Sequence, residues 1–69
     1  MITITDKVGT SGSVTVDEDD AAEAIRPWYP EAPAEVTEAI EHLGIALVRR
    51  DDRAVYELEA YLGIEIVRK

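Results

Sequence analysis

The residues best suited to metal chemistry are four consecutive acids, Asp17–Asp20, with the sequence DEDD. Carboxylates are the oxygen ligands that Ca²⁺ and Mg²⁺ prefer, but this run lacks the spaced oxygens and the glycine of a calcium-binding loop. Acids are also favoured in the first turn of a helix, where backbone N–H groups carry partial positive charge. We therefore interpret the run as a helix start with an acidic cap, and predict no metal site.

Groups for acid–base or nucleophilic catalysis are few. His42 is the only histidine, and it follows Glu38 by four residues, so the two side chains would share one helix face. A single histidine makes a zinc site only with several supporting carboxylates. There is no cysteine, Ser11 and Ser13 lie in a glycine-rich turn, and no glycine-rich phosphate loop precedes a helix. The sequence therefore predicts a protein that is not an enzyme, with no cofactor and no small-molecule substrate.

Length and charge limit the function further. The chain has 69 residues, which predicts one domain spanning 1–69, and its net charge is −8. Such acidity repels nucleic acid and anionic membranes and favours basic partners, although it is also typical of small soluble or salt-adapted proteins. The longest apolar run, GIALV, is too short to span a membrane. The N-terminus MITITDKVG does not resemble a signal peptide, so we expect a cytoplasmic protein.

The segment RPWYPEAP, residues 26–33, contains the residues best suited to binding a partner protein. Tryptophan and tyrosine are frequent anchors of protein interfaces, and here Trp28 and Tyr29 stand between prolines that restrict the chain. Alternatively, Trp28 folds back and covers the end of the helical layer, because a chain this small needs its largest side chain in the core.

The tripeptide Leu-Gly-Ile occurs twice in the chain, nineteen residues apart. VTEAIEHLGIALVRR (36–50) aligns with VYELEAYLGIEIVRK (55–69), and each copy has an apolar helical stripe, a glycine and an alternating segment. We expect Gly44 and Gly63 to end the two helices in the left-handed conformation. Strands at 45–48 and 64–68 joined by one helix would form a parallel β-α-β unit.

The first third of the chain predicts a hairpin. ITIT (2–5) and SVTV (13–16) alternate apolar and polar residues around a turn with two glycines, and a short helix through Ile25 follows, ended by Pro27 and Pro30. The predicted fold class is α/β (α+β): a small two-layer sandwich of order β-β-α-α-β-α-β. The N-terminal hairpin and the β-α-β unit would share one four-stranded sheet, with helices on one face.

The other sheet face would then expose Val48 and Val67 among threonines. Such a face, or an edge strand of the hairpin, suits a partner protein or a second copy. Tyr56 is expected to face solvent on the last helix. Glu31, Glu35 and Glu38 could imitate the spacing of phosphates, although a solvated helix face looks the same.

These features predict a small acidic protein-interaction module that binds a larger protein or itself. The alternative is an acidic inhibitor or nucleic-acid mimic that occupies a basic groove. A third reading is a DNA-binding helix-turn-helix domain that turns at Leu-Gly-Ile. The small residue usual four positions before that glycine is absent, since Ile40 and Glu59 stand there, and the net charge opposes direct binding of nucleic acid.

Overall fold

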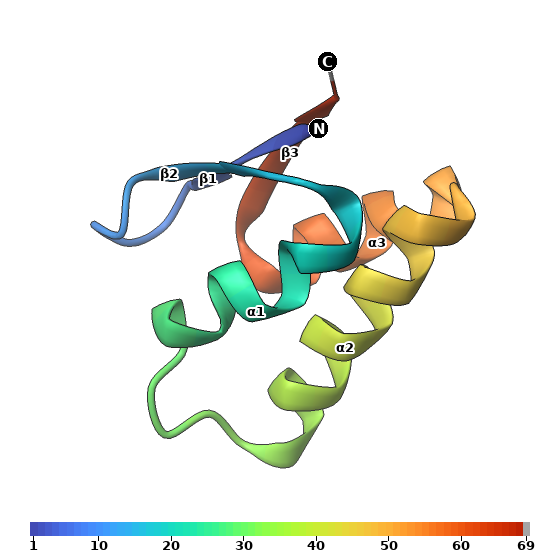
Figure 1. The fold of residues 1–69 in the computed structure, drawn as a ribbon. Coiled ribbons are helices and arrows are strands. Elements are labelled where there is room, and N and C mark those ends of the chain that lie inside the picture. The colour runs from blue at the N-terminus through green and yellow to red at the C-terminus, as the bar shows by residue number, and fades with distance from the viewer. Residues whose placement is uncertain (69) are drawn as a thin grey trace.

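The computed structural model describes residues 1–68 and shows a mixed α+β fold of two layers (Figure 1). In the described residues, three strands form one antiparallel sheet in the order β2-β1-β3. The helices lie on one face of the sheet (Figure 1). In chain order, the elements are β1 (Ile2–Asp6), β2 (Ser13–Val16), the 3₁₀ turn η1 (Glu18–Asp20), α1 (Ala21–Ile25), the 3₁₀ turn η2 (Arg26–Trp28), α2 (Ala34–Arg49), α3 (Asp52–Leu62) and β3 (Ile64–Arg68).

The predicted hairpin is confirmed. β1 and β2 pair antiparallel, with Ile2 opposite Val16 and Ile4 opposite Val14. These four residues alternate with polar ones, so they share the face that the helices cover. Ile2 and Ile4 are completely buried, whereas the two valines on the edge strand are half-buried.

Asp6 organises the turn between these strands. Its carboxylate accepts hydrogen bonds from the backbone N–H groups of Val8, Gly9 and Ser11, at 3.2, 3.0 and 3.3 Å. Partial desolvation works in the other direction, but these hydrogen bonds outweigh it and lower the pKa of Asp6. One side chain therefore satisfies three donors of a loop that has no secondary structure of its own.

The predicted strand at 45–48 is wrong, and with it the four-stranded sheet and the order β-β-α-α-β-α-β. α2 continues through Gly44 as far as Arg49. The reason is packing: Ile40, Leu43 and Leu47 recur at helical spacing and are at most 2% exposed, so continuing the helix buries one unbroken stripe. That burial outweighs the roughly 1 kcal/mol that glycine costs inside a helix.

The residue that closes α2 is instead Arg50, directly after the helix, which takes the left-handed conformation with φ 58°. The N–H of Asp51 donates to the carbonyl of Ala46 at 2.9 Å, as in the usual hydrogen-bonded closure of a helix. Asp51 directly precedes α3, and its side chain accepts a hydrogen bond from the N–H of Ala54 at 3.3 Å. The Asp51 side chain therefore caps the start of α3.

The second predicted glycine stop is confirmed. Gly63 has φ 70°, and its N–H donates to the Glu59 carbonyl at 2.9 Å. β3 begins at the next residue and pairs antiparallel with β1, with Ile66 opposite Ile4. The predicted parallel β-α-β unit is therefore wrong, because its first strand is part of α2.

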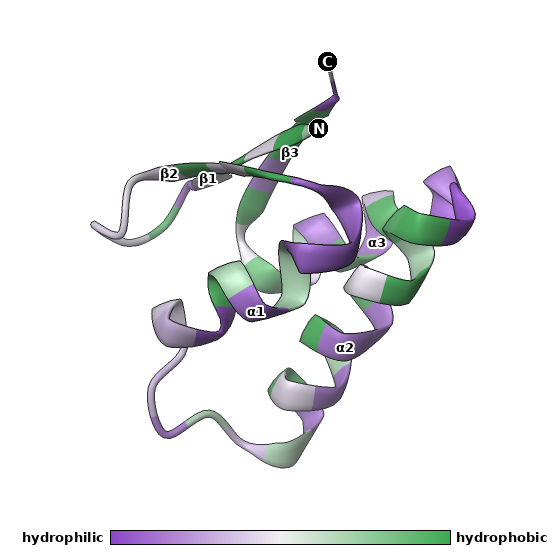
Figure 2. Ribbon diagram, viewed as in Figure 1, coloured by the Kyte–Doolittle hydropathy of each residue, from purple (hydrophilic) through white to green (hydrophobic). Residues whose placement is uncertain are grey.

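The core lies between the sheet and the helices, as the stripes of apolar residues in Figure 2 indicate. Two large apolar residues of the repeated segments lie on the surface instead: Ile45 is 52% exposed and Tyr61 is 60% exposed. The buried residues are Ile2, Ile4, Ala21, Ile25, Ala39, Ile40, Leu43, Ala46, Leu47, Val55, Leu62 and Ile64.

Candidate interaction surface

One sheet face is open, as the alternation predicted, but its composition differs from the prediction. It presents Val67, which is 52% exposed, beside a row of hydroxyl groups. Thr3 and Thr15 lie 3.0 Å apart at their Oγ1 atoms, and Thr5 and Ser13 lie 3.0 Å apart at their hydroxyl oxygens. The open face is therefore mostly polar, and its hydroxyl groups form hydrogen bonds with one another.

Val48 does not lie on this sheet face, where we expected it. It is on α2, 56% exposed, and on the opposite layer of the fold from Val67. Ile45 lies nearby on the outward side of the same helix. Both residues face outward because the buried stripe of α2 lies on the opposite side of the helix.

Two grooves meet along this outward side of α2. The α1–α2 groove, of about 460 Å³, is lined by Asp19, Ala22, Glu41, Gly44, Ile45, Val48 and Arg49. The α2–α3 groove, of about 530 Å³, is lined by His42, Ile45, Ala46, Arg49, Asp51, Ala54, Glu57, Leu58 and Tyr61. Ile45 and Arg49 belong to both grooves. We call the combined area the helical surface.

Small residues form the floor of the α1–α2 groove. A Cβ atom at Gly44 would lie 3.2 Å from the Cβ of Ala22, so the two helices approach closely there. The side chains of Ile45 and Val48 on α2 line the groove beside these small residues. The result is an apolar depression between two helices, a form that accepts an amphipathic segment of a partner.

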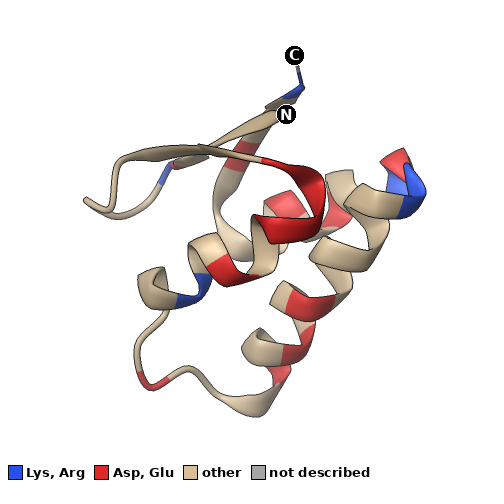
Figure 3. Cartoon of the chain, viewed as in Figure 1, with Lys and Arg blue, Asp and Glu red and all other residues tan. Residues whose placement is uncertain are grey.

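Charge on and around the helical surface is mainly negative. Acids lie on η1, on α1 and along the first half of α2, whereas arginines gather where α2 meets α3 (Figure 3). Asp19 and Glu41 stand on different helical elements along the α1–α2 groove, and Arg49 lies on its lining as well. An apolar groove with acids beside it favours a partner that is both apolar and basic.

Trp28 and Tyr29 pack against the core and are half-buried. The Tyr29 hydroxyl donates to the Leu62 carbonyl at 2.9 Å, near the end of α3. Burial, and secondarily the Asp6 carboxylate, raise the pKa of Tyr29. The loop between the prolines thus ties η2 to the end of α3, which matches the expectation that Trp28 folds back.

The remaining predicted partner-binding residues do not gather in one place. Tyr56, 73% exposed on α3, lies in a separate depression with Val8 and Gly63. Glu31 is in the loop before α2, where its φ is 57°, and Glu35 and Glu38 are exposed on the first half of α2. The structure therefore separates the predicted set over several surfaces.

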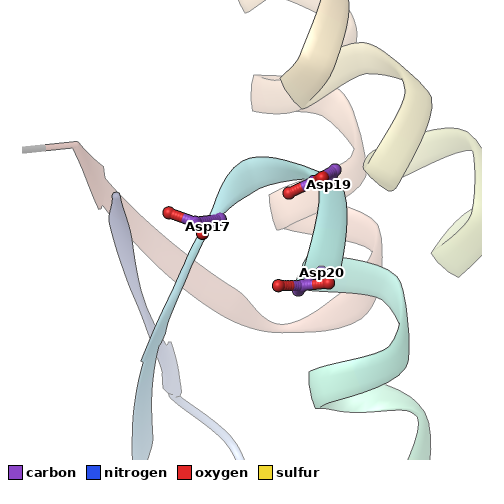
Figure 4. A group of neighbouring side chains, drawn as sticks. All are labelled: Asp17, Asp19 and Asp20. Carbon is purple, nitrogen blue, oxygen red and sulfur yellow. The ribbon is translucent and has the colours of Figure 1, made fainter.

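Three carboxylates of the DEDD run do come together. Oxygen atoms of Asp17, Asp19 and Asp20 lie within 4.8 Å of one another at the junction of β2 and η1 (Figure 4). All three residues are exposed. Asp20 precedes α1 but makes no side-chain hydrogen bond to it, so the acids complement the positive helix end by charge and not by a cap.

Sequence reasoning missed Ile45 and Tyr61 as surface residues. A strand at 45–48 would direct Ile45 toward the core, and the apolar stripe of the last helix would include Tyr61. A helical projection continued through Gly44 would have placed Ile45 opposite Ile40 and Leu47, among charged residues. An apolar residue in that position is the signal that the assumed glycine stop concealed.

No protein-family model, curated protein or solved structure matches the chain. In residues 1–68, no helix combines the length and the apolar composition needed to cross a bilayer.

Proposed function

We propose that the chain is a non-enzymatic protein-interaction module that binds a basic, partly apolar segment of a larger protein on the helical surface. The observation that carries the proposal is the exposure of Ile45 and Val48, at 52% and 56%, beside a groove with a floor of small residues. Apolar side chains clustered at a groove mark interaction sites more often than scattered ones do.

The negative charge supports the choice of partner. The net charge is −8, and Asp19 and Glu41 border the α1–α2 groove. Lysine or arginine residues flanking the apolar part of a bound segment would meet these acids and would be steered toward them over distance. Binding would thus combine apolar burial with electrostatic attraction.

The matched pair Val48 and Val67 tests the proposal. Both valines are about half exposed, but they lie on opposite layers. Val48→Lys should remove apolar contact and repel a basic partner, whereas Val67→Lys changes the net charge equally and leaves the helical surface intact. We expect a partner captured by wild type and by Val67→Lys to bind Val48→Lys at least ten-fold more weakly.

Immobilised wild type, Val48→Lys and Val67→Lys should be compared as baits, followed by titration of the purified partner by calorimetry. Circular dichroism confirms that each variant is folded. Equal capture by all three baits would refute the proposal. Selective loss with Val67→Lys would move the site to the open sheet face.

An acidic inhibitor or nucleic-acid mimic is the second candidate, and the continuity of acids over η1, α1 and the first half of α2 favours it (Figure 3). The two functions respond differently to neutral substitutions. For a mimic, Glu35→Gln with Glu38→Gln should weaken binding steeply and Val48→Ser should not; for apolar docking, the order reverses. Binding by a mimic should also fall sharply between low and high salt.

A further inference from the structure

The two edges of the sheet differ in how far their backbone groups are covered. The Lys7 N–H donates to the Gly63 carbonyl at 3.0 Å, which fixes the alternation along β3 and directs the N–H of Ile66 away from β1. That N–H donates to Glu59 Oε1 at 2.6 Å, so a side chain of α3 covers the edge. The β3 edge is therefore shielded from another strand.

The β2 edge lacks such cover. The Asp6 N–H donates to the Gly12 carbonyl at 2.9 Å, so hydrogen-bonded pairs with β1 recur at Gly12 and Val14. Ser13 and Thr15 therefore direct their backbone N–H and C=O groups outward. Within residues 1–68, no hydrogen bond satisfies these outward groups.

β2 also lies within the longest uncharged stretch of the chain. Residues 8–16 contain no ionisable side chain, although the chain as a whole has a net charge of −8. Two copies of so acidic a molecule repel each other, and contact costs least where both surfaces are neutral. The strand also has no proline or lysine, the residues that commonly protect an edge.

We infer that β2 pairs antiparallel with β2 of a second copy about a two-fold axis, which joins two three-stranded sheets into one. Residues directly opposite in an antiparallel pair share a face, so Val14 lies opposite Val14 of the second copy. Ser13 and Thr15 then form hydrogen-bonded pairs with Thr15 and Ser13 of that copy. The outward backbone N–H and C=O groups of Ser13 and Thr15 in the two copies then form four hydrogen bonds.

Side chains suit this register. On the inner face, half-buried Val14 gains apolar contact across the axis. On the outer face, the Thr3–Thr15 and Thr5–Ser13 hydroxyl pairs continue from one copy into the next. Asp17 lies opposite Ser11 of the second copy, so the acidic runs that follow β2 in the two copies do not face each other.

The helix that packs against β2 leaves room for a second copy. α1 has five residues, AAEAI, and three of them are alanine. Its small side chains reduce the bulk that two copies bring together beneath the joined strands. The contact remains short, so we expect a weak dimer that forms with rising concentration.

This inference does not depend on the proposed function, since it uses the opposite layer of the fold. Salt separates the two: high ionic strength screens the repulsion between like-charged copies and should tighten the dimer, whereas it should weaken the attraction of a basic partner.

The first experiment is sedimentation equilibrium over a range of protein concentrations, in 0.05 and 1 M NaCl. We expect the mean mass to rise from 7.6 kDa toward twice that value, and to rise earlier in high salt. Thr15→Pro removes an outward N–H without breaking the pairing of β2 with β1, so it should stay monomeric. Thr15→Val keeps the N–H and should dimerise like wild type. A monomer at every concentration overturns the inference.

Cross-linking gives a second test that does not depend on how well Thr15→Pro folds. The chain has no cysteine, so Val14→Cys introduces one thiol per copy, and the register brings the two Cα atoms within disulfide range. With oxidised glutathione, Val14→Cys should form the covalent dimer at least ten-fold faster than Val67→Cys. Val67 is the more exposed position, so equal or faster linkage by Val67→Cys, as random collision would give, contradicts the β2 pairing.

Discussion

At the scale of single residues, Gly63 connects the two layers of the molecule. Its N–H ends α3 by donating to the Glu59 carbonyl at 2.9 Å, and its carbonyl accepts from the Lys7 N–H at 3.0 Å next to β1. Gly63 makes both bonds at φ 70°, a conformation that only glycine adopts readily and that asparagine tolerates. A Cβ atom there would also lie 2.8 Å from a methyl carbon of Val8.

We predict that Gly63→Val lowers the free energy of unfolding by roughly 1–2 kcal/mol or more, because left-handed backbone is costly for a β-branched residue. Gly63→Asn should cost less, since asparagine accepts this conformation. Urea denaturation followed by circular dichroism measures both. Equal stability of the two variants would mean that the helix end does not depend on the left-handed residue.

At the scale of elements, the sequence predicts whatever depends on local pattern and misses what depends on packing. The hairpin, the cap at Asp51 and the stop at Gly63 follow from alternation and turn chemistry. Gly44 has the same neighbours, Leu and Ile, as Gly63, yet it lies within a helix. Packing distinguishes the two glycines: the helix that continues through Gly44 buries Leu47 and lies against Ala22 of α1, and the contact with α1 is not local in sequence.

The close approach of α1 and α2 predicts different effects for two substitutions at Gly44. Gly44→Ala gains up to about 1 kcal/mol of helix propensity but places a Cβ 3.2 Å from that of Ala22, so the net change should be small. Gly44→Leu should destabilise by roughly 1–3 kcal/mol, because its side chain displaces α1.

Chemical denaturation of both Gly44 variants supplies the measurement. Ala22→Gly combined with Gly44→Leu provides the control, since removing the facing methyl group should recover part of the loss beyond what the single changes add up to. A stable Gly44→Leu variant would show that α1 does not pack where the structure has it.

At the scale of the whole molecule, the excess of negative charge acts on every surface and on the fold itself. The chain has fifteen acids and seven lysines and arginines. Residues 1–68 contain four salt bridges, and in each of them at least one of the two partners is exposed to solvent. None of the four includes Asp19, Glu38 or Glu41. The sequence predicts this repulsion from composition alone, whereas the candidate surface depended on knowing that 45–48 is helical.

Self-repulsion should make stability depend on ionic strength. We predict that the melting temperature rises between 0.02 and 0.5 M NaCl, because screening shortens the reach of like-charge repulsion from about 20 Å to a few ångströms. The variant Asp19→Asn, Glu38→Gln, Glu41→Gln removes three acids and should melt higher than wild type at low salt, by about 4–8 °C for each kcal/mol of relief.

The melting temperatures of the two proteins should converge at high salt, since screening then weakens the same repulsion that the substitutions remove. If the variant keeps the same advantage in 0.5 M NaCl, the gain comes from local helix effects and the acids of η1 and α2 are not a source of repulsion. Melting curves by circular dichroism at fixed low protein concentration, where the β2 pairing contributes little, keep this measurement separate from association.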